Sequence, residues 1–276
     1  MPNYSLPGNS LLKLSALLAC AVFSACGPRF DDAAALQRQG RYLKAAQEYS
    51  LFASAKPDDP RAPEALLRSA RIYAVDLGLC AQSLPLLEKL ARSYAAFKIP
   101  PEDFRSIYIC PDYFPAADGR AWIYGDTQTF GRNARQILQV TSAREGTAEA
   151  RYSLYAGDTL VNRQKRGYAY AGLSFFEKQG GFRTNILVYP LEKGKTWQSR
   201  GAEGRLEFRV EAAGLKVKVK AGDYDNCVKV RRRVTGSPSW IYDYYAPWTG
   251  KVLTAVGGPG YENRVMELIK YEEKKQ

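Results

Sequence analysis

The sequence predicts an α+β protein, in which a short unit of α-helical hairpins precedes a large antiparallel β-rich domain. Apolar residues between positions 30 and 97 recur at the three- and four-residue intervals of an amphipathic helix. From residue 116 onward, apolar and polar residues alternate over many short segments, as in antiparallel strands with one solvated face. We expect a leader at residues 1–25, the helical unit at 26–100, a linker at 101–115 and the β-rich domain at 116–276.

The N-terminal segment has the features of an export signal. An apolar run follows Lys13, is too short to span a bilayer and ends with small residues before a cysteine. Two segments, LLAC at 17–20 and FSAC at 23–26, resemble the lipobox of bacterial lipoproteins. We favour Cys26 over Cys20 as the lipidated residue, because cleavage at Cys20 would leave only residues 14–19 as the apolar region. An ordinary secretory signal and an uncut anchoring helix are the alternatives.

The lipobox resemblance implies a membrane anchor made of acyl chains such as palmitate. Gly27 follows Cys26 at the position where the family's inner-membrane retention rule has Asp. The resemblance therefore implies delivery to the periplasmic face of the bacterial outer membrane, with inner-membrane retention left open.

The first part of the chain has the spacing of a helical repeat. Residues that resemble the second helix of a tetratricopeptide repeat, and its continuation in a looser second unit, are Gly40, Tyr42, Ala45, Tyr49, Pro57, Tyr73 and Leu87. The resemblance extends to the repeats of BamD-type outer-membrane assembly lipoproteins and YbgF-type envelope proteins, and it implies a groove for a protein partner. Only two repeats are legible, whereas stacked repeats need about three to bury a continuous core. The helices are thus expected to pack against the β-rich part or to await a partner.

The β-rich region contains about eleven candidate strands. This number of short strands predicts a large curved sheet, an open barrel or a sandwich. We expect hairpin turns at 213–214, 221–223 and 257–260. The candidate strands are 121–124, 136–142, 150–156, 168–176, 183–189, 206–210, 215–219, 227–234, 239–245, 251–255 and 264–271.

The β-rich region also contains an internal echo. The pattern P-x-x-x-G-x-x-W occurs at 115–122 and again at 190–197. Each copy predicts a turn that leads a tryptophan into a strand. Together with AGDYDNCVKV at 221–230 and YYAPWTG at 244–250, the echo resembles a group of uncharacterised bacterial lipoproteins and secreted proteins. That resemblance implies a β-rich sheet similar to lipoprotein carriers, and it implies no activity.

The cysteines and the charge indicate the compartment and the partners. Cys80, Cys110 and Cys227 follow the leader, and we expect a Cys80–Cys110 disulfide, with three buried thiols as the alternative.

The net charge of +12 is compatible with solubility, an anionic envelope surface or nucleic acid. We expect no nucleic-acid partner for an exported protein. The basic runs at 216–220 and 231–233 are candidates for the anionic-surface role, or simply a solvated strand face.

Composition argues against catalysis. The chain has no histidine, which excludes His-dependent triads and the commonest zinc ligand. We expect no enzymatic activity, no metal and no cofactor, although a pair of carboxylates across a cleft would suit a hydrolase. The aromatic residues Trp240, Tyr242, Tyr244 and Trp248 are the candidate lining of a ligand cavity.

These observations predict a non-enzymatic outer-membrane lipoprotein that acts as a protein-interaction scaffold or assembly factor. The alternative is a carrier or sensor that holds a hydrophobic ligand inside the β-rich domain.

Overall fold

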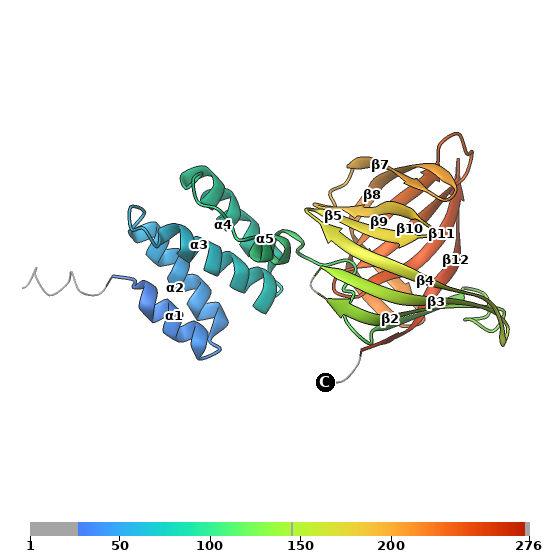
Figure 1. Cartoon of the computed structure of the whole chain (residues 1–276), viewed down its shortest axis with the longest axis horizontal. Coiled ribbons are helices and arrows are strands. Elements are labelled where there is room, and N and C mark those ends of the chain that lie inside the picture. The colour runs from blue at the N-terminus through green and yellow to red at the C-terminus, as the bar shows by residue number, and fades with distance from the viewer. Residues whose placement is uncertain (1–26, 145, 274–276) are drawn as a thin grey trace, which may run out of the picture. The chain divides into compact units, whose positions relative to one another are not determined.

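The structure is a computed structural model that describes residues 27–144 and 146–273, with the side chains of 101, 102, 104 and 105 left out. The chain divides into two compact units, with the boundary in the sequence between Ile107 and Tyr108 (Figure 1). The leader, with Cys20 and the expected lipidation site Cys26, lies outside the described residues.

The first unit is helical. Each helix from the second to the fourth packs against the one before it. Among the described residues, no helix is both long and apolar enough to cross a bilayer. The helices are α1 (Phe30–Arg38), α2 (Tyr42–Ala55), α3 (Ala62–Arg71), which continues as the π-helix η2 (Ile72–Asp76), α4 (Cys80–Ser93) and α5 (Pro101–Tyr108).

An aromatic cluster holds the first three helices together. The Phe30 ring lies 5.2 Å from the Tyr49 ring and 5.7 Å from the Phe52 ring, both edge to face. The Tyr49 hydroxyl donates to Gln37 on α1 and accepts from Arg68 on α3, each at 3.1 Å. Burying an aromatic ring while pairing its hydroxyl is the arrangement that stabilises a tyrosine in a core. Tyr49 therefore links α1, α2 and α3.

The second unit is one antiparallel sheet of twelve strands (Figure 1). Its order is β6-β5-β4-β3-β2-β1-β12-β11-β10-β9-β8-β7. The strands are β1 (Ala121–Asp126), β2 (Ala134–Arg144), β3 (Thr147–Ala156), β4 (Thr159–Ala171), β5 (Ser174–Gln179), β6 (Phe182–Val188), β7 (Thr196–Gly201), β8 (Gly204–Val219), β9 (Gly222–Val234), β10 (Trp240–Ala246), β11 (Gly250–Gly258) and β12 (Tyr261–Glu272). The predicted α+β fold class, with helices first and a large antiparallel β-rich part after them, is confirmed.

Three details of the strand prediction were wrong. The expected turn at 213–214 is absent, because β8 runs continuously from Gly204 to Val219 and absorbs those residues as irregularities in its pairing with β9. A bulge breaks the alternation in the same way as a turn, so the two are easily confused in a sequence. The single strand expected at 168–176 is instead the end of β4 and the start of β5. Strand β7 was missing from the eleven candidate ranges, although the echo predicted that Trp197 enters a strand.

The sheet consists of two six-stranded meanders, β1–β6 and β7–β12, joined where β1 pairs with β12. The turns that precede the two meanders make equivalent hydrogen bonds. The Gly119 amide donates to the Val140 carbonyl at 3.2 Å, and the Gly194 amide donates to the Val210 carbonyl at 2.8 Å. Both glycines have positive φ, +77° and +92°, a conformation that glycine adopts without steric cost. The echo in the sequence thus marks the start of each half of the sheet.

The two end strands of the order, β6 and β7, lie side by side and nearly close the sheet into a barrel. Side chains make the described hydrogen bonds across this seam. The backbone N–H of Asn185 donates to Ser199 Oγ at 2.8 Å, and the Trp197 indole donates to the backbone carbonyl of Asn185 at 2.9 Å. Thr184 Oγ1 donates to the carbonyl of Arg200 at 3.1 Å.

The segment before β1 fills one end of the barrel-like sheet. Phe114 is buried, and the centre of its ring lies 5.2, 4.8 and 4.7 Å from the ring centres of Trp122, Tyr168 and Phe175. The Phe114 amide is capped by Asp112 Oδ1 at 2.7 Å. The apolar core of the unit therefore surrounds Phe114.

Candidate functional site

A cavity of about 240 Å³ lies inside the sheet. Strands β1–β6 and β8–β11 all contribute side chains to it, so the sheet itself encloses the cavity. Buried lining residues include Phe114, Leu138 and Leu206, whereas Phe182 and Glu203 are exposed. The cavity thus has an apolar floor above the core and a solvent-exposed rim.

One wall of the cavity carries a charged and aromatic cluster. Arg166 Nη1 contacts Glu177 Oε1 at 2.8 Å, and the Tyr168 hydroxyl donates to the same oxygen at 3.0 Å. The Arg166 guanidinium lies 3.9 Å from the centre of the Tyr152 ring, which is a cation–π contact. Burial, and then the negative charge of Glu177, raise the pKa of Tyr168 well above its usual value. The phenol therefore stays protonated and acts as a donor.

A second charged cluster lies on β10 and β11. Asp243 is buried, and its Oδ1 accepts a hydrogen bond from Thr254 at 2.7 Å and lies 3.3 Å from Lys251 Nζ. Burial opposes ionisation of Asp243, but the positive charges of Lys251 and Arg232 outweigh it and lower the pKa of the carboxyl. Asp243 is consequently a carboxylate held inside the protein by its neighbours.

A third ion pair lies at the rim, where Arg232 Nη1 contacts Glu203 Oε1 at 2.9 Å. The lining therefore carries positive and negative side chains that pair with one another, so the cavity has no large excess of either sign. The buried Nε–H of Arg166 has no hydrogen-bond partner among the described residues. A buried donor without a partner is costly to the fold.

Amide and hydroxyl groups complete the polar lining, from Gln136, Gln179 and Thr184. Such a surface can orient a small polar molecule by hydrogen bonds, while the aromatic rings contact its apolar faces. In the part of the chain that the structure describes, no group of three or more Cys, Asp and Glu residues could hold a metal ion.

The four aromatic residues that we predicted to line a ligand cavity do not line this one. Trp240, Tyr242 and Tyr244 occupy alternate positions of β10, on the opposite face from Asp243 and Tyr245, which line the cavity. Trp240 borders a second, more open pocket of about 400 Å³, which shares Glu203 and Arg232 with the rim of the cavity.

The outward aromatics are covered by basic side chains. Lys229 Nζ lies 3.8 Å from the centre of the Tyr242 ring and pairs with Glu262, to which Tyr244 also donates a hydrogen bond. Trp248 is 43% exposed in the β10–β11 turn, with a φ of +60° that is unusual for a bulky residue. The four aromatics therefore do not converge on one site.

The basic run at 231–233 is matched by acidic partners. Arg231 pairs with Glu211 at 3.2 Å and Arg233 pairs with Glu207 at 2.6 Å. Lys216 pairs with Asp225 at 3.5 Å. The run at 231–233 therefore offers little uncompensated positive charge to an anionic partner.

The residues predicted from the helical repeat pattern occupy different environments. Ala45, Tyr49 and Leu87 are buried, Tyr73 is half-buried, and Tyr42 is exposed at the start of α2. Gly40 follows α1, and the exposed Pro57 follows α2. The Pro57 carbonyl accepts a hydrogen bond from Tyr94 at 2.8 Å.

The cysteines after the leader differ in state. Cys80 and Cys110 are both disulfide-bonded. Cys227 is a buried free thiol. The pairing of Cys80 with Cys110 stays a prediction.

Comparison with known proteins finds distant structural neighbours. No family model matches the chain, and no curated protein matches its sequence. A Bacteroides fragilis protein described as exported, with a YmcC-like fold, is 14% identical and aligns over 59% of this chain and all of its own, with a TM-score of 0.44. A Parabacteroides distasonis protein described as a lipoprotein is 16% identical over 58% of this chain and 98% of its own, with a TM-score of 0.40. A hypothetical protein of Chlamydia trachomatis is 11% identical over 57% of this chain and 88% of its own, with a TM-score of 0.32.

Proposed function

We propose that the chain is a non-enzymatic envelope lipoprotein whose β-sheet unit binds a small, polar, net-neutral ligand in its interior cavity. The observation that supports this proposal is the lining itself, in which Arg166 with Glu177 and Lys251 with Asp243 form matched ion pairs inside a nearly closed sheet. Charges buried in this way are costly unless they are paired, so a net-charged ligand would bring a charge that the balanced lining leaves unmatched.

The polar lining of the cavity suits a different ligand from the hydrophobic one that the sequence suggested. A carrier of a hydrophobic molecule would present an apolar lining, whereas this cavity exposes carboxylates, guanidinium groups and amides beside its aromatic rings. A ligand rich in hydroxyl or amide groups fits such a surface better than an acyl chain. Anchorage at the outer membrane through Cys26 belongs to the proposal and rests on the lipobox resemblance.

The electrostatics of the cavity favour binding over catalysis. A glycoside hydrolase needs a carboxyl whose pKa is raised so that it can act as a general acid. Asp243 shows the opposite, because Lys251 and Arg232 lower its pKa despite its burial. The absence of histidine from the sequence removes the usual alternative acid–base group.

The test compares two glutamine variants on the same strand. Gln136 lines the cavity, whereas Gln139 lies on the outer face of β2 and is exposed. Thermal shifts would be measured with N-acetylglucosamine, glycine betaine and myristate, each at about 1 mM. A ligand at 100 times its dissociation constant stabilises the folded state by about 2.7 kcal/mol.

We expect one of the two polar probes to raise the melting temperature of the wild type and of Gln139→Trp, and to have no effect on Gln136→Trp. A shift with myristate alone would support the hydrophobic carrier instead. A shift that survives in Gln136→Trp would place the ligand outside the cavity.

A scaffold role for the helical unit is a second candidate, and exposed leucines favour it. Leu43 and Leu51 on α2 are 50% and 55% exposed, and Leu51 borders an open groove along α1 and α2. Crosslinking in the envelope should give a stoichiometric adduct that is lost in Leu43→Ser with Leu51→Ser. The adduct should persist in the control Leu84→Ser, whose leucine is 42% exposed on α4. An adduct that the first variant leaves intact would argue against docking at α2.

A further inference from the structure

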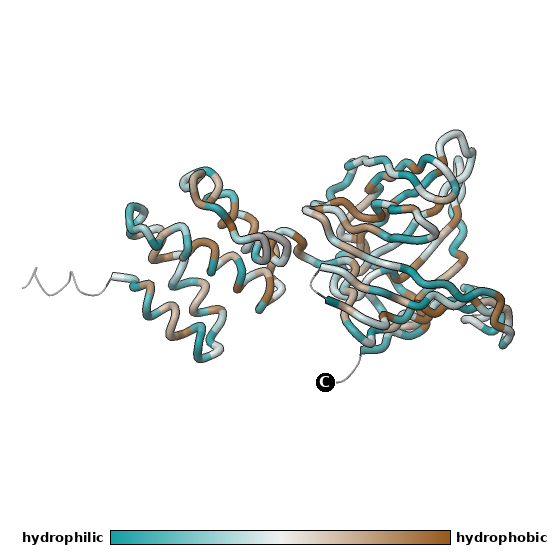
Figure 2. The backbone as a smooth tube through the Cα atoms, viewed as in Figure 1, coloured by the Kyte–Doolittle hydropathy of each residue, from teal (hydrophilic) through white to brown (hydrophobic). Residues whose placement is uncertain are grey.

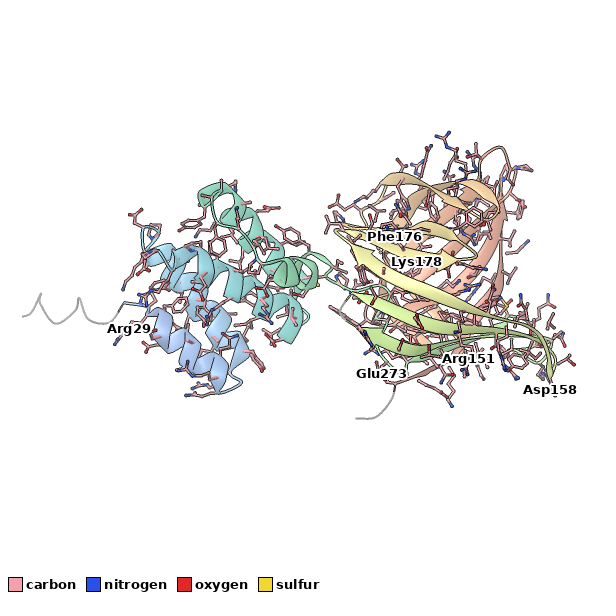
Figure 3. The ribbon with its side chains drawn as sticks, in the orientation of Figure 1. Arg29, Arg151, Asp158, Phe176, Lys178 and Glu273 are labelled. Carbon is pink, nitrogen blue, oxygen red and sulfur yellow. The ribbon has the colours of Figure 1, made fainter. Side chains whose placement is uncertain are left out.

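The outer face of strands β3 to β6 carries an unusual concentration of positive charge, which we call the basic face. Its members point away from the cavity, because they alternate with cavity-lining residues on each strand. All of them are exposed. They are Arg151 on β3, Arg163 and Lys165 on β4, Lys178 on β5 and Arg183 on β6; Figure 3 labels Arg151 and Lys178.

Like charges face each other directly across these strands. Arg151 is the register partner of Lys165, and Lys178 is the register partner of Arg183. Directly opposed like charges destabilise a sheet. Within residues 27–144 and 146–273, none of the five basic side chains forms an ion pair, in contrast to the arginines at 231–233. The fold thus tolerates a repulsion that an external anion would relieve.

Acidic side chains near the basic face are few. Glu149 lies on the same face of β3 as Arg151, and Asp158 lies at the tip of the β3–β4 hairpin (Figure 3). The five basic groups therefore outnumber the acidic ones on this face, and the excess is positive.

Exposed aliphatic side chains adjoin the basic face. Leu160 and Val161 are 40% and 59% exposed near the tip of the β3–β4 hairpin, just before Arg163 in the same strand. Figure 2 shows hydrophobic residues near the end of this hairpin, which projects from the sheet. Exposed apolar residues next to clustered basic ones are typical of surfaces that meet a lipid headgroup region.

We propose that the basic face and the hairpin tip dock on a membrane surface that contains anionic lipids. Phosphate headgroups would neutralise the opposed pairs Arg151–Lys165 and Lys178–Arg183, and Leu160 with Val161 would enter the boundary of the acyl layer. An acidic wall polymer could satisfy the charges but offers no apolar phase to the two aliphatic side chains. The lipid surface is therefore the occupant that fits both observations. This inference is independent of the cavity ligand.

The test uses a protein that begins at Gly27, which keeps every described residue and lacks the apolar leader. Sedimentation with vesicles that contain about 30% phosphatidylglycerol in phosphatidylcholine is compared with sedimentation on pure phosphatidylcholine. We expect binding to the anionic vesicles alone, and we expect it to weaken as salt rises, because exposed charges are screened.

Two variants separate the charge from the aliphatic tip. Each basic residue near an anionic leaflet contributes about a fivefold gain in affinity, so Arg151→Gln with Lys165→Gln should weaken binding by about 25-fold. Leu160→Ser with Val161→Ser should also weaken binding while leaving its dependence on salt in place. The matched control is Lys216→Gln with Lys218→Gln, two exposed lysines of β8, which should bind as the wild type does.

The charge variant should change thermal stability in the opposite direction to vesicle binding. Neutralising Arg151 and Lys165 removes a like-charge repulsion, so the melting temperature should rise while vesicle binding falls. The proposal would be overturned if the β8 control lost as much binding as the variant of Arg151 and Lys165, or if the protein bound neutral vesicles equally well. It would also be overturned if the protein bound polyglutamate, as a model of an acidic polymer, but did not bind vesicles.

Discussion

Trp122 and Trp197, which lie 75 residues apart, occupy the second position of β1 and of β7, the first strands of the two halves of the sheet. The Trp122 indole donates to the Thr249 carbonyl at 2.6 Å, and the Trp197 indole donates to the Asn185 carbonyl at 2.9 Å. Trp122 is fully buried, whereas Trp197 lies at the seam and is half-buried. Trp122 therefore stabilises the core, and Trp197 stabilises the contact between β6 and β7.

Replacing these tryptophans should have unequal effects. Trp122→Phe removes a buried hydrogen bond and leaves a void, and we expect a loss of about 2 kcal/mol in the free energy of unfolding. Trp197→Phe should lose about 1 kcal/mol, because mainly one hydrogen bond is removed. Urea unfolding measures both, with Trp248→Phe in an exposed turn as the control that changes little. Equal losses for Trp122 and Trp197 would contradict this view of the two positions.

The seam should open locally when its side-chain hydrogen bonds are removed. Ser199→Ala deletes the acceptor of the Asn185 amide, so hydrogen exchange at Asn185 should accelerate by about fivefold, which corresponds to about 1 kcal/mol. Amides of β1 and β12, which pair by a backbone ladder, should keep their protection. Ser142→Ala, at an exposed position of β2, is the control. If the Asn185 amide exchanged at an unchanged rate, the seam would not depend on Ser199.

Asp243 should be important for stability and for its dependence on pH. Asp243→Asn removes the ion-pair partner of Lys251 and a buried negative charge near Arg232, and we expect a loss of about 3 kcal/mol at pH 7. The pKa of Asp243 is lowered from an ordinary value of 3.8, so its contribution is fully present above about pH 4. That contribution is lost as the pH falls through the lower, folded-state value.

The variant should therefore lose less stability than the wild type between pH 5 and about pH 2. Urea unfolding across that range measures the difference. Asp225→Asn, which removes an exposed partner of Lys216, should follow the wild-type curve. An unchanged curve for Asp243→Asn would show that the carboxylate is not held by its neighbours.

Cys227 should be unreactive in the folded protein. Burial, and then the charge of Asp225, raise the pKa of the thiol to about 11, and the side chain is inaccessible. Since the thiolate is the reactive form, iodoacetamide at pH 8 should label Cys227 only after unfolding. Mass spectrometry of the alkylated protein measures this. Labelling of the native protein at the rate of an exposed thiol would mean that the core around Cys227 opens.

The expected Cys80–Cys110 bond has a direct test. Digestion of the non-reduced protein should release one cross-linked peptide pair that contains Cys80 and Cys110, and reduction should separate it. Alkylated peptides of Cys80 or Cys110 from the non-reduced protein would contradict the pairing.

Periodicity predicted the elements better than it predicted the site. The spacing of Ala45, Tyr49 and Phe52 identified the buried side of α2, and the P-x-x-x-G-x-x-W echo identified the two turns that begin the halves of the sheet. Arg166 and Glu177 gave no such signal, because each is a single charged residue in an alternating strand. Such residues are most often solvated, and only closure of the sheet places these two inside.

The sequence by itself determined an α+β chain with helices first, many alternating strands and an internal duplication. It also separated the residues of strand β10 into two sets, with Trp240, Tyr242 and Tyr244 in one and Asp243 and Tyr245 in the other. Which set faces inward was decided only by the tertiary structure. Alternation assigns residues to faces but does not name the concave face, and here Lys251 and Arg232 from neighbouring strands supply the charges that allow Asp243 to be buried.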